Sequence, residues 1–230
     1  MRLGLCMGVL ATVLAAGTAH ATPSRATGAE VCGNPGYSYA GFQSRGAAHG
    51  VRATLSAIAR PYVASGHVAA WVGVGGPGGG PNGTDEWIQV GLSAFSDGTS
   101  QLYYEITRPR IGTTYTSVVE AVNPGEAFAV AVVELPAKAN WWRVEVNGAP
   151  VSRAVRLPGS HGTWQATATS ETWNAGTRGC NRFAYRFAQV SADGTAGWHP
   201  LGAASVLSGR GYGVLARTPS SFIAKSLWDP

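Results

Sequence analysis

Short runs of alternating apolar and polar residues, separated by glycine, proline and asparagine, follow one another along most of this 230-residue chain. Alternation with a period of two is typical of strands that bury one face. The runs predict strands over residues 37–43, 68–74, 87–92, 101–107, 115–122, 127–134, 141–146, 151–157, 164–173 and 183–190, with two more in the tail at 203–207 and 213–217. Many short strands with frequent turns favour an all-β sandwich.

Three local signals refine this prediction. Asn147-Gly148 lies between two of the runs and predicts a tight hairpin. Val51, Leu55 and Ile58 are spaced as on one face of a helix, so this segment is ambiguous between helix and strand. Residues 75–83 are rich in glycine and proline, and no Gly-Lys-Ser/Thr follows them. We therefore interpret them as a flexible connection rather than a phosphate-binding loop.

Residues two apart in a strand share a face, which divides each run into a core side and an outer side. The apolar sets predict a core face made of Val72, Val74, Ile88, Val90, Leu92, Leu102, Tyr104 and Ile106. The opposite face then carries Trp71, Trp87, Gln89, Tyr103, Glu105, Glu171 and Trp173. Exposed aromatic rings beside polar groups usually indicate a binding surface. The alternative is that loops or the tail cover this face and make its tryptophans part of a core.

The first residues are typical of a secretory signal. Arg2 precedes a nearly uninterrupted apolar stretch, and Ala19-His20-Ala21 has the small-x-small form of a cleavage site. We predict a signal peptide over residues 1–21, a leader over 22–36 and one β-sandwich domain over 37–230, secreted to the extracellular space. The apolar stretch is too short for a membrane span and no later segment is long enough, so no membrane partner is expected.

Two cysteines remain after residue 21, Cys32 and Cys180. In an oxidising compartment such a pair most simply forms one disulfide, which contributes about 4–5 kcal/mol in the chain-entropy model. No Cys or His lies at ligand spacing beside either of them, so we predict neither a metal site nor another cofactor. His49, His67, His161 and His199 are isolated in the sequence and are predicted to be surface or hydrogen-bonded residues rather than ligands.

The charge pattern excludes one class of partner. The chain carries a net charge of +5, but its basic residues are scattered without a Lys/Arg run. Nucleic-acid binding is therefore not expected. No Gly-x-Ser-x-Gly elbow appears either, which argues against a serine hydrolase. We expect a monomer.

Several short segments of the sequence, in the same order along the chain, resemble motifs of the eqolisin-type glutamic peptidases. Ala70-Trp71-Val72-Gly73 looks like the family's Ala-Trp-Val-Gly strand, and Ile88-Gln89-Val90-Gly91 looks like its catalytic-glutamine segment. Tyr103-Tyr104-Glu105 is similar to its Trp-Tyr-Glu strand, and Ser170-Glu171-Thr172-Trp173 lies where the family carries its catalytic glutamate. The resemblance covers roughly residues 37–190.

The resemblance implies a concanavalin-like β-sandwich of two bent antiparallel sheets and a secreted endopeptidase that needs no cofactor. Glu171 would take a proton from the attacking water, and the Gln89 amide would stabilise the oxyanion. We expect both side chains to be exposed on one sheet face. Trp71, Trp87, Tyr103, Glu105 and Trp173 would bind the polypeptide substrate.

A second hypothesis is a non-catalytic carbohydrate- or peptide-binding module, because exposed tryptophans stack on sugars as readily as they line peptide grooves. A retaining glycanase would need two carboxyl groups about 5 Å apart. Glu105 and Glu171 could supply them. Binding that survives the loss of the Glu171 carboxylate would favour the module.

Overall fold

The computed structural model describes residues 36–177 and 179–227, without the side chain of Arg217. Within these ranges the chain forms two antiparallel sheets, one 3-10 turn at Pro81–Gly83 and no α-helix. The prediction of an all-β sandwich is thus confirmed. No helix in the described ranges is long and apolar enough to cross a membrane. The predicted signal peptide, the leader and Cys32 lie outside the described residues.

The first sheet, sheet A, has seven strands. In spatial order they are β14 (Ala204–Ser208), β1 (Tyr37–Ala47), β11 (Gln165–Trp173), β3 (His67–Gly76), β4 (Glu86–Phe95), β5 (Ser100–Arg108) and β6 (Gly112–Glu120). The four central strands β11, β3, β4 and β5 carry the predicted site residues, although residues 71 and 171 are far apart in the sequence.

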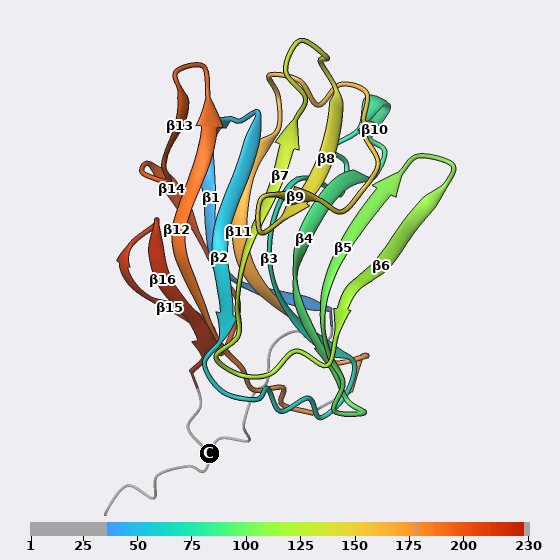
Figure 1. The fold of residues 1–230 in the computed structure, drawn as a ribbon. Helices are drawn as coiled ribbons and strands as arrows, with labels where there is room; N and C mark the ends of the chain where they lie inside the picture. The colour runs from blue at the N-terminus through green and yellow to red at the C-terminus, as the bar shows by residue number, and fades with distance from the viewer. Residues whose placement is uncertain (1–35, 178, 228–230) are drawn as a thin grey trace, which may run out of the picture.

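The second sheet, sheet B, packs against the first (Figure 1). Its main path is β10 (Val155–Arg156), β8 (Trp141–Val146), β7 (Ala127–Glu134), β2 (Gly50–Ala57), β12 (Ala184–Gly194), β16 (Ser221–Ser226) and β15 (Tyr212–Thr218). β13 (Gly197–Pro200) pairs with β12, and β9 (Ala149–Pro150) pairs with β8. The chain crosses repeatedly from one sheet to the other, so the sandwich forms a single unit.

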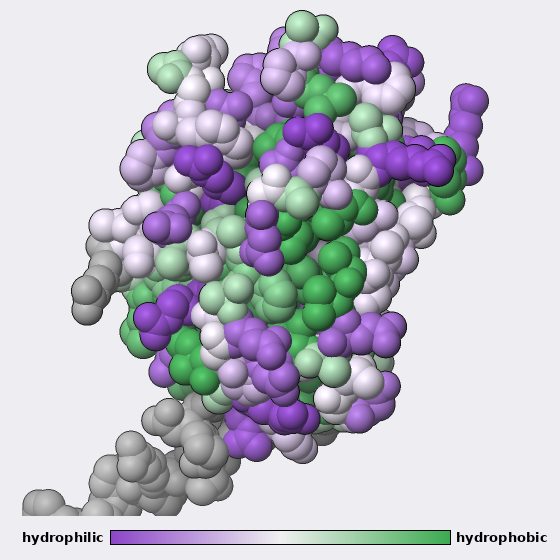
Figure 2. All heavy atoms as spheres, viewed as in Figure 1, coloured by the Kyte–Doolittle hydropathy of each residue, from purple (hydrophilic) through white to green (hydrophobic). Residues whose placement is uncertain are grey.

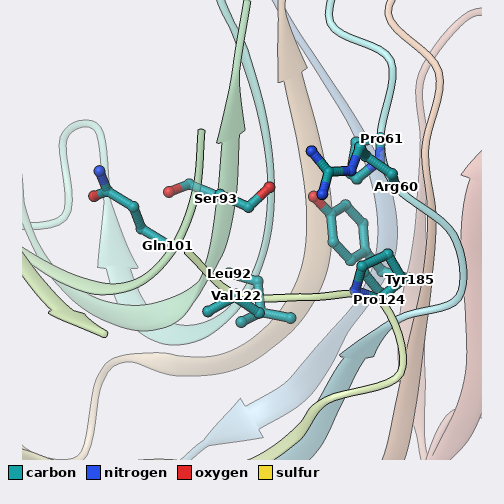
Figure 3. A pocket seen from close by; sticks show the side chains of 10 residues that line it. Arg60, Pro61, Leu92, Ser93, Gln101, Val122, Pro124 and Tyr185 are labelled. Carbon is teal, nitrogen blue, oxygen red and sulfur yellow. The ribbon is translucent and has the colours of Figure 1, made fainter. Parts of the chain in front are cut away.

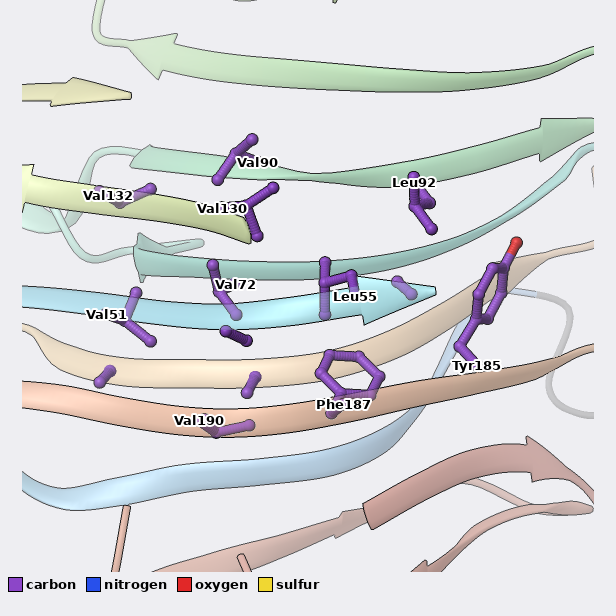
Figure 4. Packing of buried hydrophobic residues seen from close by; sticks show 14 of the residues in the cluster. Val51, Leu55, Val72, Val90, Leu92, Val130, Val132, Tyr185, Phe187 and Val190 are labelled. Atoms are coloured by element: carbon purple, nitrogen blue, oxygen red, sulfur yellow. The ribbon is translucent and has the colours of Figure 1, made fainter. Parts of the chain in front are cut away.

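The core lies between the sheets. Val72 and Val90 from sheet A face Leu55, Val130 and Phe187 from sheet B (Figure 4). All five side chains are almost completely shielded from solvent, as are the other members of this cluster. Burying an aliphatic side chain of this size contributes about 1.5–3 kcal/mol. The core therefore fixes which face of each strand of sheet A points outward.

Most strand predictions are confirmed, and β7 and β8 have the predicted bounds. The ambiguous segment at Val51 is a strand, because β2 buries every second residue. The predicted strand over 151–157 is wrong: only Val155–Arg156 pairs, and the Ser152 Oγ accepts the backbone N–H of Val144 in place of a ladder bond, at 2.8 Å. Three strands, β9, β13 and β16, were not predicted.

The hairpin at Asn147-Gly148 is confirmed, since both residues have positive φ angles of 49° and 79°.

Figure 2 shows the surface of the molecule from the side used in Figure 1. Apolar side chains gather over the middle of this face, and hydrophilic ones lie towards its ends.

Candidate active site

The outer face of sheet A carries the predicted site residues, as the alternation of the strands predicts. Val72, Ile88 and Val90 point into the core, so their neighbours Trp71 and Gln89 point outward. This face is nevertheless not open to solvent. Gln89 and Glu171 are only 7% and 8% exposed, so the expectation that both are exposed is wrong.

The reason for this burial is the size of the side chains on the same face. Tyr103 from β5 stacks on Tyr115 from β6 with their ring centroids 4.8 Å apart, and Tyr103 is 1% exposed. The Tyr115 hydroxyl reaches Ser93 on β4 at 2.7 Å. The aromatic rings thus lean along the sheet and cover the polar groups between them.

A pocket remains on this face, which we call the Glu171 pocket. It is lined by His67, Ala69, Ser93, Phe95, Tyr103, Glu105, Tyr115 and Glu171. Three of the predicted site residues, Tyr103, Glu105 and Glu171, therefore share one pocket. His67, Ser93 and Tyr115 were not predicted. His67 lies four residues from Trp71 on β3, and Ser93 lies four residues from Gln89 on β4, so alternation could have identified both.

Glu171 lies at one side of the pocket. It is paired in the strand register with Tyr39 of β1 and Ala69 of β3. The Nε2 atom of His67 lies 3.5 Å from its Oε1 atom. Burial, and then the charge of Glu171, raises the pKa of Tyr39. Hence Tyr39 stays a neutral hydrogen-bonding group beside the carboxylate.

Aromatic rings surround this side of the pocket. Tyr37 stacks on Trp173 with ring centroids 6.3 Å apart, and His67 lies 5.7 Å from Trp173. Tyr37 is 49% exposed, and Tyr39 and Trp173 are each 36% exposed. These rings offer flat apolar surface next to a carboxylate.

Glu105 lines the pocket from β5. Its Oε1 atom accepts a hydrogen bond from the indole N–H of Trp87 at 2.7 Å. Burial raises the pKa of Glu105 and the charge of Glu171 raises it further, against the hydrogen bond from Trp87 and the charge of His67, which lower it. Glu105 therefore holds a proton more readily than an ordinary glutamate. The hydrogen bond from Trp87, which was predicted to bind substrate, orients the Glu105 carboxyl group.

Gln89 is directly opposite Glu105 in the register of β4 and β5. Its side-chain amide donates to the Tyr103 hydroxyl oxygen at 3.1 Å. On its other side is Gly73, where a Cβ atom would lie 2.8 Å from the Cβ of Gln89. Gly91 likewise leaves room for Trp71. Glycines in these strands thus let the site side chains lie close together.

The register separates Gln89 from Glu171. Gln89 is opposite Gly73 on β3, whereas Glu171 is opposite Ala69. The two side chains therefore lie in different rows of the sheet, four residues apart along β3, whereas the Glu105 side chain lines the same pocket as Glu171. The residue of β11 opposite Gly73 is Thr167. The structure thus brings Gln89 to Tyr103, brings Glu171 to His67, and places Glu105 in the same pocket lining as Glu171.

Trp71 lies on β3 in the row between these two groups, opposite Gly91 and Thr169. Its indole N–H is buried and finds no hydrogen-bond partner among the described residues. A buried donor without a partner costs free energy, and a bound ligand could satisfy it. Trp71 is therefore consistent with the substrate-binding role that the resemblance implies.

A second pocket lies between the sheets at one end of the sandwich, where Arg60, Leu92 and Tyr185 approach one another (Figure 3). Its volume of about 10 Å³ has room for about one water molecule. None of the described residues that line it carries a carboxylate. This pocket is too small for a substrate. The Glu171 pocket is the candidate active site because two carboxyl groups and three of the predicted site residues line it.

The prediction that the histidines are surface or hydrogen-bonded residues is confirmed for His49 and His161, whose rings both hydrogen-bond to Glu134. His67 contacts Glu171, and His49 and His161 both contact Glu134. These contacts join residues that are far apart in the sequence, and no local spacing indicates them. The predicted disulfide joins Cys180 to Cys32, which lies outside the described residues.

No protein-family model and no curated protein matches the chain. Solved structures do match it. A scytalido-glutamic peptidase structure with a peptide-based transition state analog has a TM-score of 0.59 and 16% identity, and covers 82% of this chain and 97% of that one. SCP-B, a member of the eqolisin family of peptidases in a complex with the tripeptide Ala-Ile-His, has a TM-score of 0.54 with the same identity and coverage. The chain therefore has an eqolisin-like fold.

Proposed function

We propose that this eqolisin-like β-sandwich is a secreted peptide hydrolase whose reaction takes place in the Glu171 pocket. The observation that carries the proposal is the presence of two carboxyl groups, Glu105 and Glu171, in the lining of one pocket. Hydrolysis by an activated water needs one carboxylate to accept a proton and one acid to donate a proton. The similar structures were solved with a peptide-based analog and a tripeptide, which supports a polypeptide as the substrate.

The two carboxyl groups have different surroundings, and this difference assigns their roles. Glu171 lies in the pocket lining with the His67 Nε2 atom 3.5 Å from its Oε1 atom, and we assign it to take the proton of the water that attacks the scissile carbonyl carbon. Glu105, whose pKa is raised by burial, protonates the leaving amine as the C–N bond breaks. Exchange with solvent then moves a proton from Glu171 back to Glu105.

The oxyanion needs a hydrogen-bond donor. The Gln89 amide donates to the Tyr103 oxygen, which leaves the Tyr103 hydroxyl proton free to point into the pocket. We therefore assign oxyanion stabilisation to Tyr103, with Gln89 as the residue that positions it. Removing one such donor from comparable sites lowers kcat by about 100-fold to 1000-fold.

The test is cleavage of denatured casein by the purified chain from acidic to neutral pH. Glu171→Gln and Glu105→Gln are compared with Glu120→Gln, a matched control because Glu120 is an exposed glutamate of the same sheet. We expect cleavage by the wild type and the control, and its loss in both pocket variants while the fold is retained. Absence of cleavage by the folded wild type at every pH would contradict the proposal.

One observation favours a second candidate function, which is peptide or carbohydrate binding without hydrolysis. Gln89 and Glu171 lie in separate rows, and Thr167 occupies the position of β11 that shares the Gln89 row. The exposed rings of Tyr37, Tyr39 and Trp173 would then be a stacking surface. Calorimetric titration with peptides and oligosaccharides tests this candidate, which requires binding that Glu171→Gln does not weaken.

A further inference from the structure

A cluster of two histidines and a glutamate lies away from the Glu171 pocket. His49 is in the turn between β1 and β2, Glu134 is the last residue of β7, and His161 is in the loop that leads into β11. The Nδ1 atom of His49 lies 2.7 Å from Oε2 of Glu134, and Nδ1 of His161 lies 2.9 Å from the same oxygen. One ligand atom from each side chain lies within 4.8 Å of the others.

The cluster is shielded on one side and open on the other. The Glu134 side chain is 4% exposed, whereas those of His49 and His161 are 30% and 50% exposed. The carboxylate is thus the most buried group of the cluster, and both imidazole rings contact its Oε2 atom with their centroids 5.0 Å apart. An ion could enter from the solvent side without any rearrangement of the core.

The protein backbone holds the three segments together. The N–H of Glu134 donates to the carbonyl oxygen of His49 at 2.7 Å. The side-chain oxygen of Asn140 accepts the N–H of His161 at 3.0 Å, and the Asn140 N–H donates to Oε1 of Glu134. These bonds fix the carboxylate and both histidine backbones before any ligand arrives. A site whose ligands are fixed in advance loses less entropy when it binds.

We propose that His49, Glu134 and His161 bind a zinc ion through the two Nδ1 atoms and the carboxylate. Two imidazoles and one carboxylate are a known zinc ligand set, and such sites keep their fourth position for water. Zn–N and Zn–O bonds of about 2.0–2.2 Å in a tetrahedron separate the ligand atoms by roughly 3.3 Å. Each N···O distance therefore needs to open by only about half an ångström.

The ligand types also select among metals. Imidazole nitrogen suits zinc and its neighbours in the first transition row, whereas calcium and magnesium prefer sites made of oxygen atoms. Zinc would connect the β1–β2 turn, the end of β7 and the loop before β11. None of these three residues lines the Glu171 pocket, so the expected role is to stabilise this end of the sandwich and not to take part in peptide hydrolysis.

The test begins with equilibrium dialysis of the purified, tag-free, metal-free chain against zinc chloride, followed by atomic emission. We expect one zinc ion per wild-type chain and at least a roughly tenfold weaker affinity in His49→Ala and His161→Ala. His199→Ala is the matched control, since His199 is an exposed histidine of β13 outside the cluster, and it should bind zinc as the wild type does.

Thermal unfolding gives a second readout. Zinc should raise the Tm of the wild type and of His199→Ala by several degrees, because a ligand that binds only the folded state stabilises it. It should leave His161→Ala unchanged, and calcium should raise the Tm of none of them. His161 is half exposed, so this variant is expected to fold, which its Tm without zinc verifies.

Equal zinc binding by His161→Ala and the wild type, or no zinc binding by the wild type, would overturn the proposal. The cluster would then be a hydrogen-bonded group only. Visible absorption after substitution with cobalt distinguishes a tetrahedral site from surface binding and should be lost in His49→Ala. Chelation should remove the rise in Tm and leave casein cleavage intact, so the outcome here is independent of the proposed peptidase activity.

Discussion

Glu134 and Glu171 are both buried glutamates, but they differ in how their oxygens are used. Glu134 accepts hydrogen bonds from His49, His161 and the Asn140 N–H. Although burial raises the pKa of Glu134, these bonds together hold it below its ordinary value. Glu171 lies 3.5 Å from His67 and opens into a pocket. A carboxylate with fixed partners serves structure or metal binding, and one that faces a pocket is available for chemistry.

The largest expected effect tests this difference directly. Glu171→Gln should lower casein cleavage by about 1000-fold or more, because the amide cannot accept a proton from water. Its Tm should stay close to that of the wild type. Glu134→Gln should lower the Tm and retain most of the casein cleavage of the folded protein. The comparison fails if Glu134→Gln, measured on folded protein, reduces cleavage as much as Glu171→Gln does.

Glu105→Gln should have the next largest effect, a loss of about 100-fold, because it removes the proposed acid. Burial and the charge of Glu171 raise the pKa of Glu105, so its protonated form persists to higher pH than in an ordinary glutamate. Wild-type activity should fall as the pH rises through this raised pKa. The pH profile of kcat measures this fall. If kcat of Glu105→Gln falls at high pH in the same way as that of the wild type, Glu105 is not the acid.

Tyr103→Phe should lower kcat by about 100-fold, since it removes the hydroxyl that we assign to the oxyanion. Gln89 is assigned to the same function through its hydrogen bond to Tyr103. Gln89→Ala should therefore add little to the loss once Tyr103 is phenylalanine. If the double variant loses a further 100-fold in kcat, Gln89 stabilises the oxyanion directly, as the sequence resemblance implies.

The sequence predicted the faces of the strands correctly because alternation is a local property. Leu92 is buried and Gln89 points to the opposite face, as the spacing requires. Alternation does not reveal which residues lie side by side on neighbouring strands. The row that contains Gln89 and Thr167 depends on how β4 and β11 each pair with β3, and no single strand encodes this register.

For a related reason, the sequence did not predict the burial of the site residues or the clusters of residues that are far apart in the chain. Gln89 is buried and hydrogen-bonds to Tyr103, which stacks on Tyr115 of the next strand, and these positions follow from the tertiary structure. Glu134 and its two histidines belong to three segments that only the completed sandwich brings together. Helical spacing in β2 was ambiguous because Ile58, just beyond the strand, extended the pattern by one turn.

Glu134→Gln should reduce the free energy of unfolding by about 2 kcal/mol at neutral pH, since hydrogen bonds to a charged group contribute about 1.5–3 kcal/mol. The folded-state pKa of Glu134 is depressed. Its contribution is therefore present above the unfolded pKa and disappears as the pH falls through the folded pKa. Urea unfolding of both proteins should show a difference at neutral pH that vanishes in acid, and a difference that persists there would point to lost packing instead.

The last prediction concerns Glu86, a third buried glutamate, which does not line the Glu171 pocket. It is 1% exposed, and neither carboxylate oxygen finds a hydrogen bond among the described residues. Burial raises the pKa of Glu86 to about 7, so the folded protein keeps it protonated where the unfolded chain ionises it. Stability should then fall as the pH rises from the unfolded pKa towards this value.

Glu86→Gln removes this titration while it keeps the shape of the side chain. We expect the variant to match the wild type in acid and to be more stable by about 1–3 kcal/mol at neutral pH. Thermal unfolding across this range measures the difference, and Glu120→Gln is again the exposed control. An equal pH dependence in wild type and variant would show that Glu86 is paired in solution. The comparison would then be between Glu134, which has fixed hydrogen-bond partners, and the two glutamates that line the pocket. No buried glutamate would remain that has neither a partner nor a pocket.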